Sequence, residues 1–175
     1  LGYSILRSKK FLQCPFIFHT SDTILKDKIR HNEFNWIGGY RGEGSSLYRS
    51  FNILNGKVQP IQEKGAMKPD YLAIGLVGIK DYLDFWKALE KLYKSNPEDS
   101  SLGDTHVINK MIETGSIFKL REFKEWHDTG NVGSLYDVRK RISNSAHSLD
   151  KLEESIFIFK NFVVKFFHDH RIIKD

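Results

Sequence analysis

Apolar runs that suit β-strands alternate along this chain with segments in which apolar residues recur every three or four positions, the spacing of an amphipathic helix. The predicted helices cover residues 2–12, 82–95, 104–113 and 132–142, and the predicted strands cover residues 16–19, 71–79 and 116–122. Asp81 precedes the second helix as a candidate N-cap. The alternation favours a layered α/β domain over a helical bundle or a β-sandwich.

A β-hairpin is predicted in the middle of the chain. Two extended runs, Leu47–Leu54 and Lys57–Gln62, flank the dipeptide Asn55-Gly56, which is the strongest short-range hairpin signal. The strand predicted at 71–79 is interrupted by glycines, so a substrate or a packed helix can approach its backbone closely.

A second, shorter module is predicted towards the C-terminus. Residues 145–153 form a polar stretch that we interpret as a linker, and the apolar runs 155–159 and 162–167 predict another hairpin. A lone hairpin is not stable by itself. Residues 154–175 therefore either pack on the preceding domain, residues 1–144, or begin a further domain.

Composition narrows the class of protein. The 175 residues are 40% hydrophobic, enough for one domain and the beginning of another. No apolar run reaches about 18 residues and the first residues resemble no targeting peptide, so we expect a cytoplasmic protein with no membrane partner. The net charge of +5 is spread out, which suits mild phosphate attraction or an incidentally basic surface, with no nucleic-acid partner. Cys14, the only cysteine, excludes an internal disulfide and is expected to pack as a small apolar residue.

The candidate chemistry centres on two aspartates that each follow a strand-like run. Asp22 ends the segment Phe16-Ile-Phe-His-Thr-Ser-Asp22, and Asp128 lies in Trp126-His-Asp128-Thr-Gly130. Two carboxylates from separate strand ends can share a hard divalent cation, which neutralises phosphate groups. Each aspartate alone is explained equally well as a turn or cap residue, because Asp side chains accept hydrogen bonds from free backbone N–H groups.

Four short segments in this order resemble the sugar nucleotidyltransferases, the NDP-sugar pyrophosphorylases. They are the two aspartate segments, Ile61-Gln-Glu63-Lys64 after the central hairpin, and Ala73-Ile-Gly75-Leu within the long strand. The resemblance covers residues 1–142. It implies an α/β fold, a Rossmann-like mixed sheet of the nucleotidyltransferase type, incomplete at its N-terminus and followed by a short β-hairpin.

The resemblance also implies an activity. A nucleoside monophosphate would pass from a nucleoside triphosphate to a sugar 1-phosphate or similar phosphorylated acceptor, with release of pyrophosphate, in nucleotide-sugar or surface polysaccharide biosynthesis. Asp22 and Asp128 match the aspartates that would hold Mg²⁺. Glu63 matches a glutamate that accepts sugar hydroxyls, and Lys64 matches a lysine that meets the sugar phosphate and is the catalytic candidate. The remaining substrate-binding candidates are Gly75, which matches a glycine of the sugar pocket, and Tyr48.

The chain departs from the family pattern in three places. It lacks the glycine-rich loop ending in Thr-Arg that binds the triphosphate, so we expect the intact parent to be the enzyme and this chain alone to be inactive. Ser21 stands where glycine is usual. The chain reads Tyr48-Arg49 where the family often has Tyr-Gly, and Glu63-Lys64-Gly65 where it often has Glu-Lys-Pro. These changes predict altered sugar contacts or an acceptor other than a typical hexose.

Other interpretations stay open. Lys165 lies in a run that weakly resembles the first strands of choline- and aminoglycoside-kinase-like phosphotransferases, in which a strand lysine meets nucleotide phosphates. A solvated strand face explains it as well. The chain could also be a non-catalytic sugar- or nucleotide-binding module, or part of a bifunctional protein whose main activity is a downstream kinase-like domain. A homo-oligomer stays open too.

Overall fold

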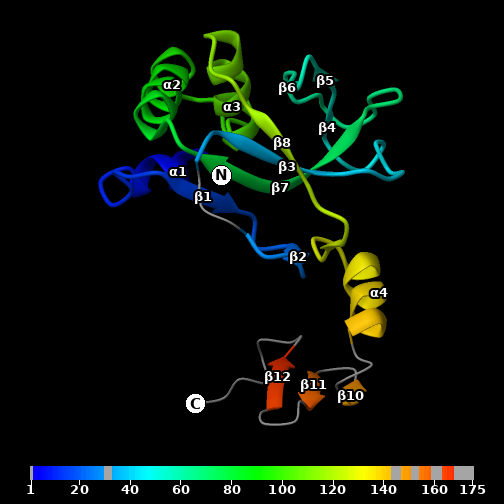
Figure 1. Cartoon of the computed structure of the whole chain (residues 1–175). Helices are drawn as coiled ribbons and strands as arrows, with labels where there is room; N and C mark the ends of the chain where they lie inside the picture. The colour runs from blue at the N-terminus through cyan, green and yellow to red at the C-terminus, as the bar shows by residue number, and fades with distance from the viewer. Residues whose placement is uncertain (1, 30–32, 143–146, 151–153, 159–162, 168–175) are drawn as a thin grey trace. The chain divides into compact units, whose positions relative to one another are not determined.

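The computed structural model describes residues 2–29, 33–142, 147–150, 154–158 and 163–167. The chain forms two compact units, Leu1–Trp126 and His127–Asp175, called unit 1 and unit 2 below. In chain order the elements are α1 (Gly2–Ser8), β1 (Phe16–His19), β2 (Thr23–Leu25), β3 (Trp36–Tyr40), β4 (Ser50–Phe51), β5 (Ile53–Leu54), β6 (Lys57–Val58), β7 (Tyr71–Ile79), α2 (Tyr82–Ser95), α3 (Asp104–Glu113), β8 (Lys119–Glu122), β9 (Trp126–Asp128), α4 (Val132–Ile142), β10 (His147–Asp150), β11 (Glu154–Ile158) and β12 (Val163–Phe167) (Figure 1).

Unit 1 is built on a mixed sheet of five strands in which β7 is central. β1 and β3 pair with β7 in antiparallel orientation, one on each edge, and β8 pairs with β3 in parallel orientation. The two-residue β4 pairs antiparallel with the beginning of β7, on the edge that β1 occupies further along. Parallel and antiparallel pairs within one sheet confirm the predicted mixed α/β class.

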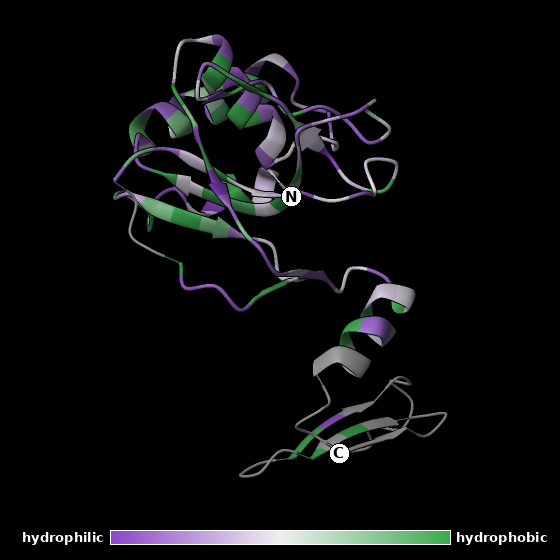
Figure 2. Cartoon of the chain, turned by 45° about the vertical axis from the view of Figure 1, so that its right-hand side comes forward, coloured by the Kyte–Doolittle hydropathy of each residue, from purple (hydrophilic) through white to green (hydrophobic). Residues whose placement is uncertain are grey.

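Both faces of β7 are buried, which explains its nearly continuous apolar sequence. The larger core lies between the sheet and helices α2 and α3, which cover one face (Figure 1). Its fully buried side chains include Phe51, Ile79, Phe85, Trp86, Leu89, Val107, Ile108, Met111 and Phe118. A smaller cluster of Trp36, Ile74, Leu76 and Phe123 forms the second core. Along the helices of unit 1, hydrophobic residues recur among hydrophilic ones, as the periodicity of the sequence predicts (Figure 2).

The central hairpin is confirmed at its turn. β5 and β6 pair across Asn55 and Gly56, whose φ values of 51° and 72° suit the type I′ turn that Asn-Gly favours. The strand predicted from residue 47 begins later. The amides of Leu47 and Tyr48 both donate to the carbonyl of Gly44, which makes this stretch a turn instead.

Three local predictions in unit 1 need correction. The first helix ends at Ser8 and not at residue 12. The Ser8 hydroxyl donates to the Ile5 carbonyl at 2.6 Å and competes with the helical hydrogen bonds. Asp81 is the N-cap residue of α2 as predicted, but it makes no side-chain cap hydrogen bond, and its carboxylate instead accepts from Asn35 Nδ2 at 2.6 Å. Cys14 is exposed instead of packed.

Unit 2 contains α4 and an antiparallel sheet in the order β10-β11-β12. The predicted hairpin corresponds to β11 and β12, whereas β10 comes from within the stretch 145–153 that we interpreted as a linker. Strand pairing uses backbone groups, so a polar sequence does not prevent it. The division of the chain into two units falls between Trp126 and His127, earlier in the sequence than the predicted domain boundary at residue 144. Among the described residues, no helix has the length and apolar character needed to cross a bilayer.

Candidate functional site

The candidate residues of unit 1 gather along one edge of β7, at the point where its partner strand changes. β4 pairs with the beginning of β7 and β1 with its end. Between the two, the Ala73 amide donates to the Arg49 carbonyl at 2.8 Å, and the Gly75 carbonyl accepts from the Thr20 amide at 2.9 Å. Two residues of a strand span about 7 Å. The Tyr48-Arg49 segment and the turn after β1 therefore flank the same short stretch of β7.

Asp22 lies in a tight turn between β1 and β2 that is fastened to β7. The Thr23 hydroxyl donates to the Ile74 carbonyl at 2.9 Å and lies 3.0 Å from the Thr20 hydroxyl. The Thr23 amide also donates to the Thr20 carbonyl, which closes the turn. Thr23 is buried while Asp22 is exposed. The two threonines thus anchor the turn to the sheet and leave the aspartate at its outer side.

Gly75 is the residue that this turn requires. Its φ is +71°, and a Cβ built at this position would lie only 2.3 Å from Thr20 Oγ1. The sequence predicted that a substrate or a packed helix approaches the glycines of the strand, and at Gly75 the neighbour is instead the Thr20 side chain. A packing reason therefore accounts for this glycine, and its role in a sugar pocket stays a prediction.

The Glu63-Lys64 dipeptide follows a segment that is held from two directions. The side-chain amide of Asn109, on α3, accepts from the Ile61 amide at 2.7 Å and donates to the Ile61 carbonyl at 2.9 Å. The next residue, Gln62, exchanges two backbone hydrogen bonds with Ser50 at 2.7 and 3.2 Å. Since both anchors lie immediately before Glu63, the position of the dipeptide is set by α3 and β4.

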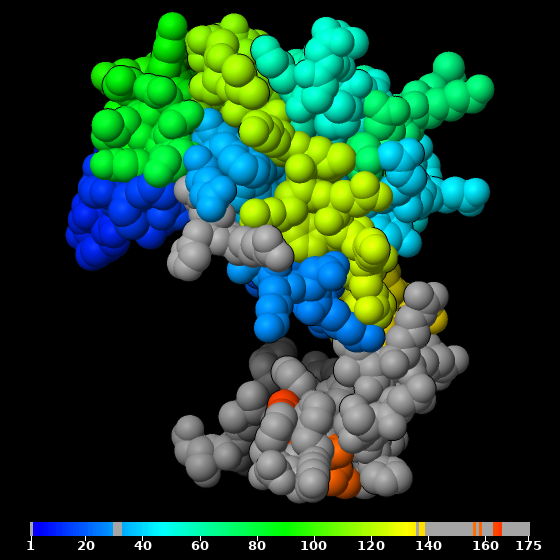
Figure 3. All heavy atoms as spheres, in the orientation of Figure 1, coloured from blue at the N-terminus to red at the C-terminus, as the bar shows by residue number. Residues whose placement is uncertain are grey.

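A further anchor lies immediately after the dipeptide. The Gly65 amide donates to the Ser45 carbonyl at 2.7 Å, and Gly65 has a φ of +92°. The segments around Gly65 and Ser45 lie side by side, visible as the two protruding loops at one end of unit 1 (Figures 1 and 3). A positive φ is typical of glycine at a sharp turn.

The two side chains of the dipeptide differ in their partners. Both oxygens of Glu63 lie 3.2 Å from Arg49 Nε, which forms an ion pair. Lys64 is exposed, and its ammonium group makes no hydrogen bond or ion pair with any residue in the described part of the chain. Glu63 is therefore neutralised by a residue of this chain, whereas Lys64 presents a cation to solvent.

Arg49 connects this segment to the beginning of α3. Its Nη1 lies 3.4 Å from the Thr105 hydroxyl. The neighbouring Asp104 carboxyl has a raised pKa because burial disfavours its charged form, and the Thr105 backbone N–H and the positive charge of Arg49 oppose that shift. Thr105 and Asn109 are four residues apart on α3, and residues at that spacing share one face of a helix. One face of α3 therefore holds both the Arg49 side chain and the Ile61 backbone.

Tyr48 belongs to an aromatic cluster with Tyr40 and Trp126. The rings of Tyr48 and Trp126 meet edge to face with centroids 4.7 Å apart, and the Tyr40 ring lies 5.6 Å from that of Trp126. Such pairs contribute about 0.5–1.5 kcal/mol beyond their buried area. Tyr48 is thus a packed residue beside the Arg49 segment, and its substrate contact stays a prediction.

Asp128 lies in unit 2, at the end of β9. One carboxylate oxygen accepts from the Gly130 amide at 3.0 Å, and the other lies 3.4 Å from Asn131 Nδ2 and 3.3 Å from Ser134 Oγ. The N-cap of α4 is Asn131, whose Oδ1 accepts from the Ser134 amide at 2.9 Å. Asp128 therefore acts as a turn residue, and its role as a metal ligand stays a prediction.

The predicted Mg²⁺ pairing joins the two units. Asp22 belongs to unit 1 and Asp128 to unit 2, so their meeting around one ion stays a prediction. Their donor chemistry fits, because Mg²⁺ takes oxygen ligands and typically uses one or two carboxylates together with waters and substrate phosphates. Within the described residues, no group of three or more His, Cys, Asp or Glu side chains could hold a metal without such help.

Lys165 is exposed near the middle of β12, opposite Ile156 of β11. The predicted nucleotide contact at this lysine, and the kinase-like character of its module, stay predictions.

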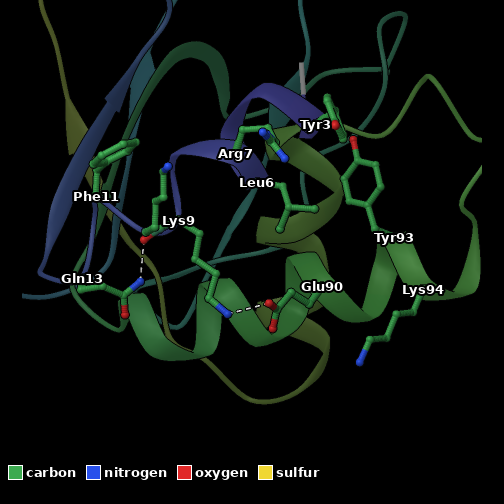
Figure 4. Close-up of a pocket in the computed structure, with 10 residues that line it drawn as sticks. Tyr3, Leu6, Arg7, Lys9, Phe11, Gln13, Glu90, Tyr93 and Lys94 are labelled. Carbon is green, nitrogen blue, oxygen red and sulfur yellow. Dashed lines mark hydrogen bonds and ion pairs between the residues drawn. The ribbon is translucent and has the colours of Figure 1, made fainter.

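A cavity of about 940 Å³ lies between α1 and α2, away from the segments described above. Figure 4 shows its lining, in which Lys9 forms an ion pair with Glu90 at 2.6 Å and Tyr3 lies near Tyr93. None of the residues predicted to bind substrate or metal lines it. The candidate site in unit 1 is therefore not this cavity. It consists of the surface segments with Asp22, Tyr48 and Glu63-Lys64, which hydrogen bonds hold near β7.

Sequence reasoning missed the residues that hold the site in place. Thr20, Thr105 and Asn109 were not selected, because single polar residues in strand-end and helical patterns carry no recognisable motif. Arg49 was noticed only as a departure from a family pattern. The available signal for the ion pair was an arginine next to one substrate-binding candidate, Tyr48, and a glutamate in another candidate segment.

Comparisons with known proteins give the fold. No protein-family model matches the chain, and no curated protein matches it in sequence. Among solved structures, it is similar to the CTP:phosphocholine cytidylyltransferase of Streptococcus pneumoniae, with a TM-score of 0.68 and 15% identity over 81% of this chain and 63% of that one. A Bacillus anthracis protein described as a glucose-1-phosphate thymidylyltransferase, in complex with a sucrose, has a TM-score of 0.66 and 19% identity over 86% and 63%.

The UTP-bound UGPase of Acinetobacter baumannii is also similar, with a TM-score of 0.59 and 17% identity over 82% of this chain and 56% of that one. The chain thus spans less than two thirds of the length of these proteins. At such identities the similarity concerns the fold. The nucleotidyltransferase-type α/β fold predicted from the sequence is confirmed, and its partial extent agrees with the predicted incompleteness.

Proposed function

We propose that this chain is the acceptor- and metal-binding part of a nucleotidyltransferase, which joins a nucleoside monophosphate to a sugar 1-phosphate or similar phosphorylated acceptor. The observation that carries the proposal is the environment of Lys64. On a sheet with the fold of these enzymes, the segment around it is clamped at Ile61, Gln62 and Gly65, while its own ammonium has no partner among the described residues. A compact, flexible cation on a fixed backbone suits a phosphate ligand.

The proposed reaction needs no protein nucleophile. An oxygen of the acceptor phosphate attacks the α-phosphorus of the triphosphate, the bond to the bridging oxygen breaks, and pyrophosphate leaves. Lys64 would hold the acceptor phosphate and offset its charge, which brings two anions within reach of one another. Asp22 and Asp128 would hold Mg²⁺, which supplies positive charge to the phosphates when it is bound.

The anchors described above have a part in this mechanism. Asn109 and Ser50 fix the chain immediately before Lys64, so the ammonium is presented from a defined point and only the lysine side chain needs to be ordered by a ligand. Less ordering on binding leaves more of the interaction free energy for affinity. The turn with Asp22 is fastened to the edge of β7 with which β4 also pairs, and β4 in turn holds the acceptor segment at Gln62.

Phosphate binding by this chain is the direct test. Isothermal titration calorimetry with glucose 1-phosphate should detect binding, and glucose, which lacks the phosphate, should bind much more weakly. Lys64→Ala should weaken the affinity by about tenfold or more, because hydrogen bonds to charged groups contribute on the order of 1.5–3 kcal/mol. Lys57→Ala, which removes another exposed lysine of the same hairpin region, is the matched control and should leave the affinity unchanged.

Equal affinities for Lys64→Ala and the unsubstituted chain would contradict the role of Lys64. A chain that binds neither a phosphorylated acceptor nor a nucleoside triphosphate would contradict the proposed function as a whole. Circular dichroism and thermal unfolding of each variant establish that the fold is retained before affinities are compared.

A further inference from the structure

Arg49 forms an ion pair with Glu63 of the proposed acceptor segment, and the proposed function leaves the role of this arginine unexplained. It stands where the nucleotidyltransferase pattern often has glycine, so this chain has a guanidinium where that pattern has no side chain. Its backbone carbonyl is fixed by the Ala73 amide on β7 at 2.8 Å, and its Nη1 lies 3.4 Å from the Thr105 hydroxyl. β7 thus fixes the backbone of Arg49, and α3 contacts its side chain.

The guanidinium changes the charge that an acceptor would meet. Arg49 Nε lies 3.2 Å from both oxygens of Glu63, which is the carboxylate assigned to the acceptor. Glu63 is therefore already paired with a cation of the protein and offers little net negative charge to a positively charged ligand. The next residue, Lys64, adds a further positive charge.

Arg49 also has unused hydrogen-bond donors. A guanidinium carries five N–H groups, and the described partners engage only Nε and Nη1. The side chain keeps 38% of its surface accessible, so a ligand can reach it. Donors of this kind suit hydroxyl and other oxygen atoms, whereas a quaternary ammonium has no lone pair to accept a hydrogen bond and is repelled by the like charge.

We infer that Arg49 is a specificity-determining residue that selects a phosphorylated acceptor rich in hydroxyl groups against one that carries a quaternary ammonium. This inference rests on the proposed function, since it concerns the acceptor site of that reaction. It separates the two chemical classes that occur among the structural neighbours, sugar phosphates and phosphocholine. In the selected class, hydroxyl oxygens accept from the free N–H groups of Arg49 while Glu63, oriented by the ion pair, accepts from hydroxyl hydrogens.

The test compares two ligands that share a phosphate and differ in the remaining group. Glucose 1-phosphate and phosphocholine are titrated into the chain, and the ratio of their dissociation constants is the readout. The chain should bind glucose 1-phosphate at least about tenfold more tightly, because the positive charges of Arg49 and of the quaternary ammonium repel one another. Arg49→Gln should lower the ratio about fivefold or more, by weakening the sugar phosphate and strengthening phosphocholine.

Two matched variants separate this inference from the proposed function. Arg7→Gln makes the same change of charge on α1 and should leave the ratio unaltered. Lys64→Ala should weaken both ligands alike, because the phosphate is common to them, and so reports on the proposed function and not on selectivity.

An unchanged ratio in Arg49→Gln, with both ligands still bound through Lys64, would overturn the inference and leave the proposed function standing. A preference of the unsubstituted chain for phosphocholine would overturn it as well, and would indicate instead that the aromatic side chains beside Arg49 recognise the ammonium group. If neither ligand binds, the inference falls together with the proposed function.

Discussion

The two candidate segments of unit 1 are held in place by different means. The turn with Asp22 is held by side chains of the turn itself, since two threonine hydroxyls pack onto β7 at a glycine. The Glu63-Lys64 segment is held by groups of other elements: a side chain of α3, and backbone hydrogen bonds to β4 and to the loop that contains Ser45. The first attachment depends on space, because a Cβ at Gly75 would clash. The second depends on hydrogen bonds, which can be removed one at a time.

The largest effect is expected where the attachment depends on space. Gly75→Ala would combine a φ of +71° with a Cβ only 2.3 Å from Thr20 Oγ1. We expect it to lower the free energy of unfolding by about 3 kcal/mol, from left-handed backbone strain and overpacking together. Urea denaturation followed by circular dichroism measures this. Gly56→Ala is the matched control: its φ of +72° is almost the same but nothing lies within 4 Å, so it should cost only about 1 kcal/mol.

Equal costs at the two glycines would show that the contact with Thr20 does not hold the Asp22 turn. The comparison would then have to be revised, since both attachments would depend on backbone conformation and hydrogen bonds alone.

A smaller effect is expected where the attachment depends on hydrogen bonds. Asn109→Ala leaves the Ile61 amide and carbonyl without their side-chain partners. The free energy of unfolding should fall by about 1–3 kcal/mol, and glucose 1-phosphate should bind several-fold more weakly because Lys64 is less well positioned. Asn52→Ala removes an exposed hydrogen bond to the Asp70 amide and serves as the control. A loss of stability without any loss of affinity would separate Asn109 from the acceptor segment.

The smallest effect concerns pH and the helix end beside Arg49. Burial raises the pKa of Asp104 above its ordinary value of 3.8, so the folded state takes up this proton at a higher pH than the unfolded state. As pH falls through the raised pKa towards 3.8, the penalty for the buried charge disappears and Asp104 destabilises the fold less. Asp104→Asn should therefore be the more stable protein at neutral pH, with the difference shrinking in acid.

Unfolding free energies of the two proteins measured across that pH range provide the check. A difference that stays constant with pH would mean that Asp104 has the same pKa in both states. Because the charge of Arg49 lowers this pKa, Arg49→Gln should shift the pH dependence of the otherwise unchanged protein to higher pH.

Sequence reasoning found the parts of the fold that depend on repeated patterns. The apolar run of β7 and the helical spacing of α3 and α4 gave their bounds directly, because burial imposes those patterns over many residues. The Asn55-Gly56 turn was equally clear, since few dipeptides tolerate two positive φ values. Strand β10 was missed because pairing through backbone groups leaves little trace in a polar sequence.

The candidate site was predictable in its motifs and not in its supports. Glu63 and Lys64 were found by resemblance, but Asn109, which fixes the chain before them, lies more than forty residues later in a helix predicted for its apolar face. Gly75 was selected as a possible substrate contact, which stays a prediction, and its packing against Thr20 was not foreseen. Contacts between residues far apart in sequence depend on the fold, and a single sequence does not reveal which pairs will meet.

Because of the backbone hydrogen bond between Gly65 and Ser45, a substitution in one of these two loops affects the other loop. Proline at residue 65, the residue that the Glu-Lys-Pro pattern would place there, has a φ fixed near −65° and no N–H to donate, whereas Gly65 has a φ of +92° and donates to Ser45. The family tripeptide therefore could not be grafted into this chain by one substitution. The loop that contains Ser45 would have to be redesigned in the same step. Transfer of either loop between this chain and a protein of similar fold therefore requires transfer of both.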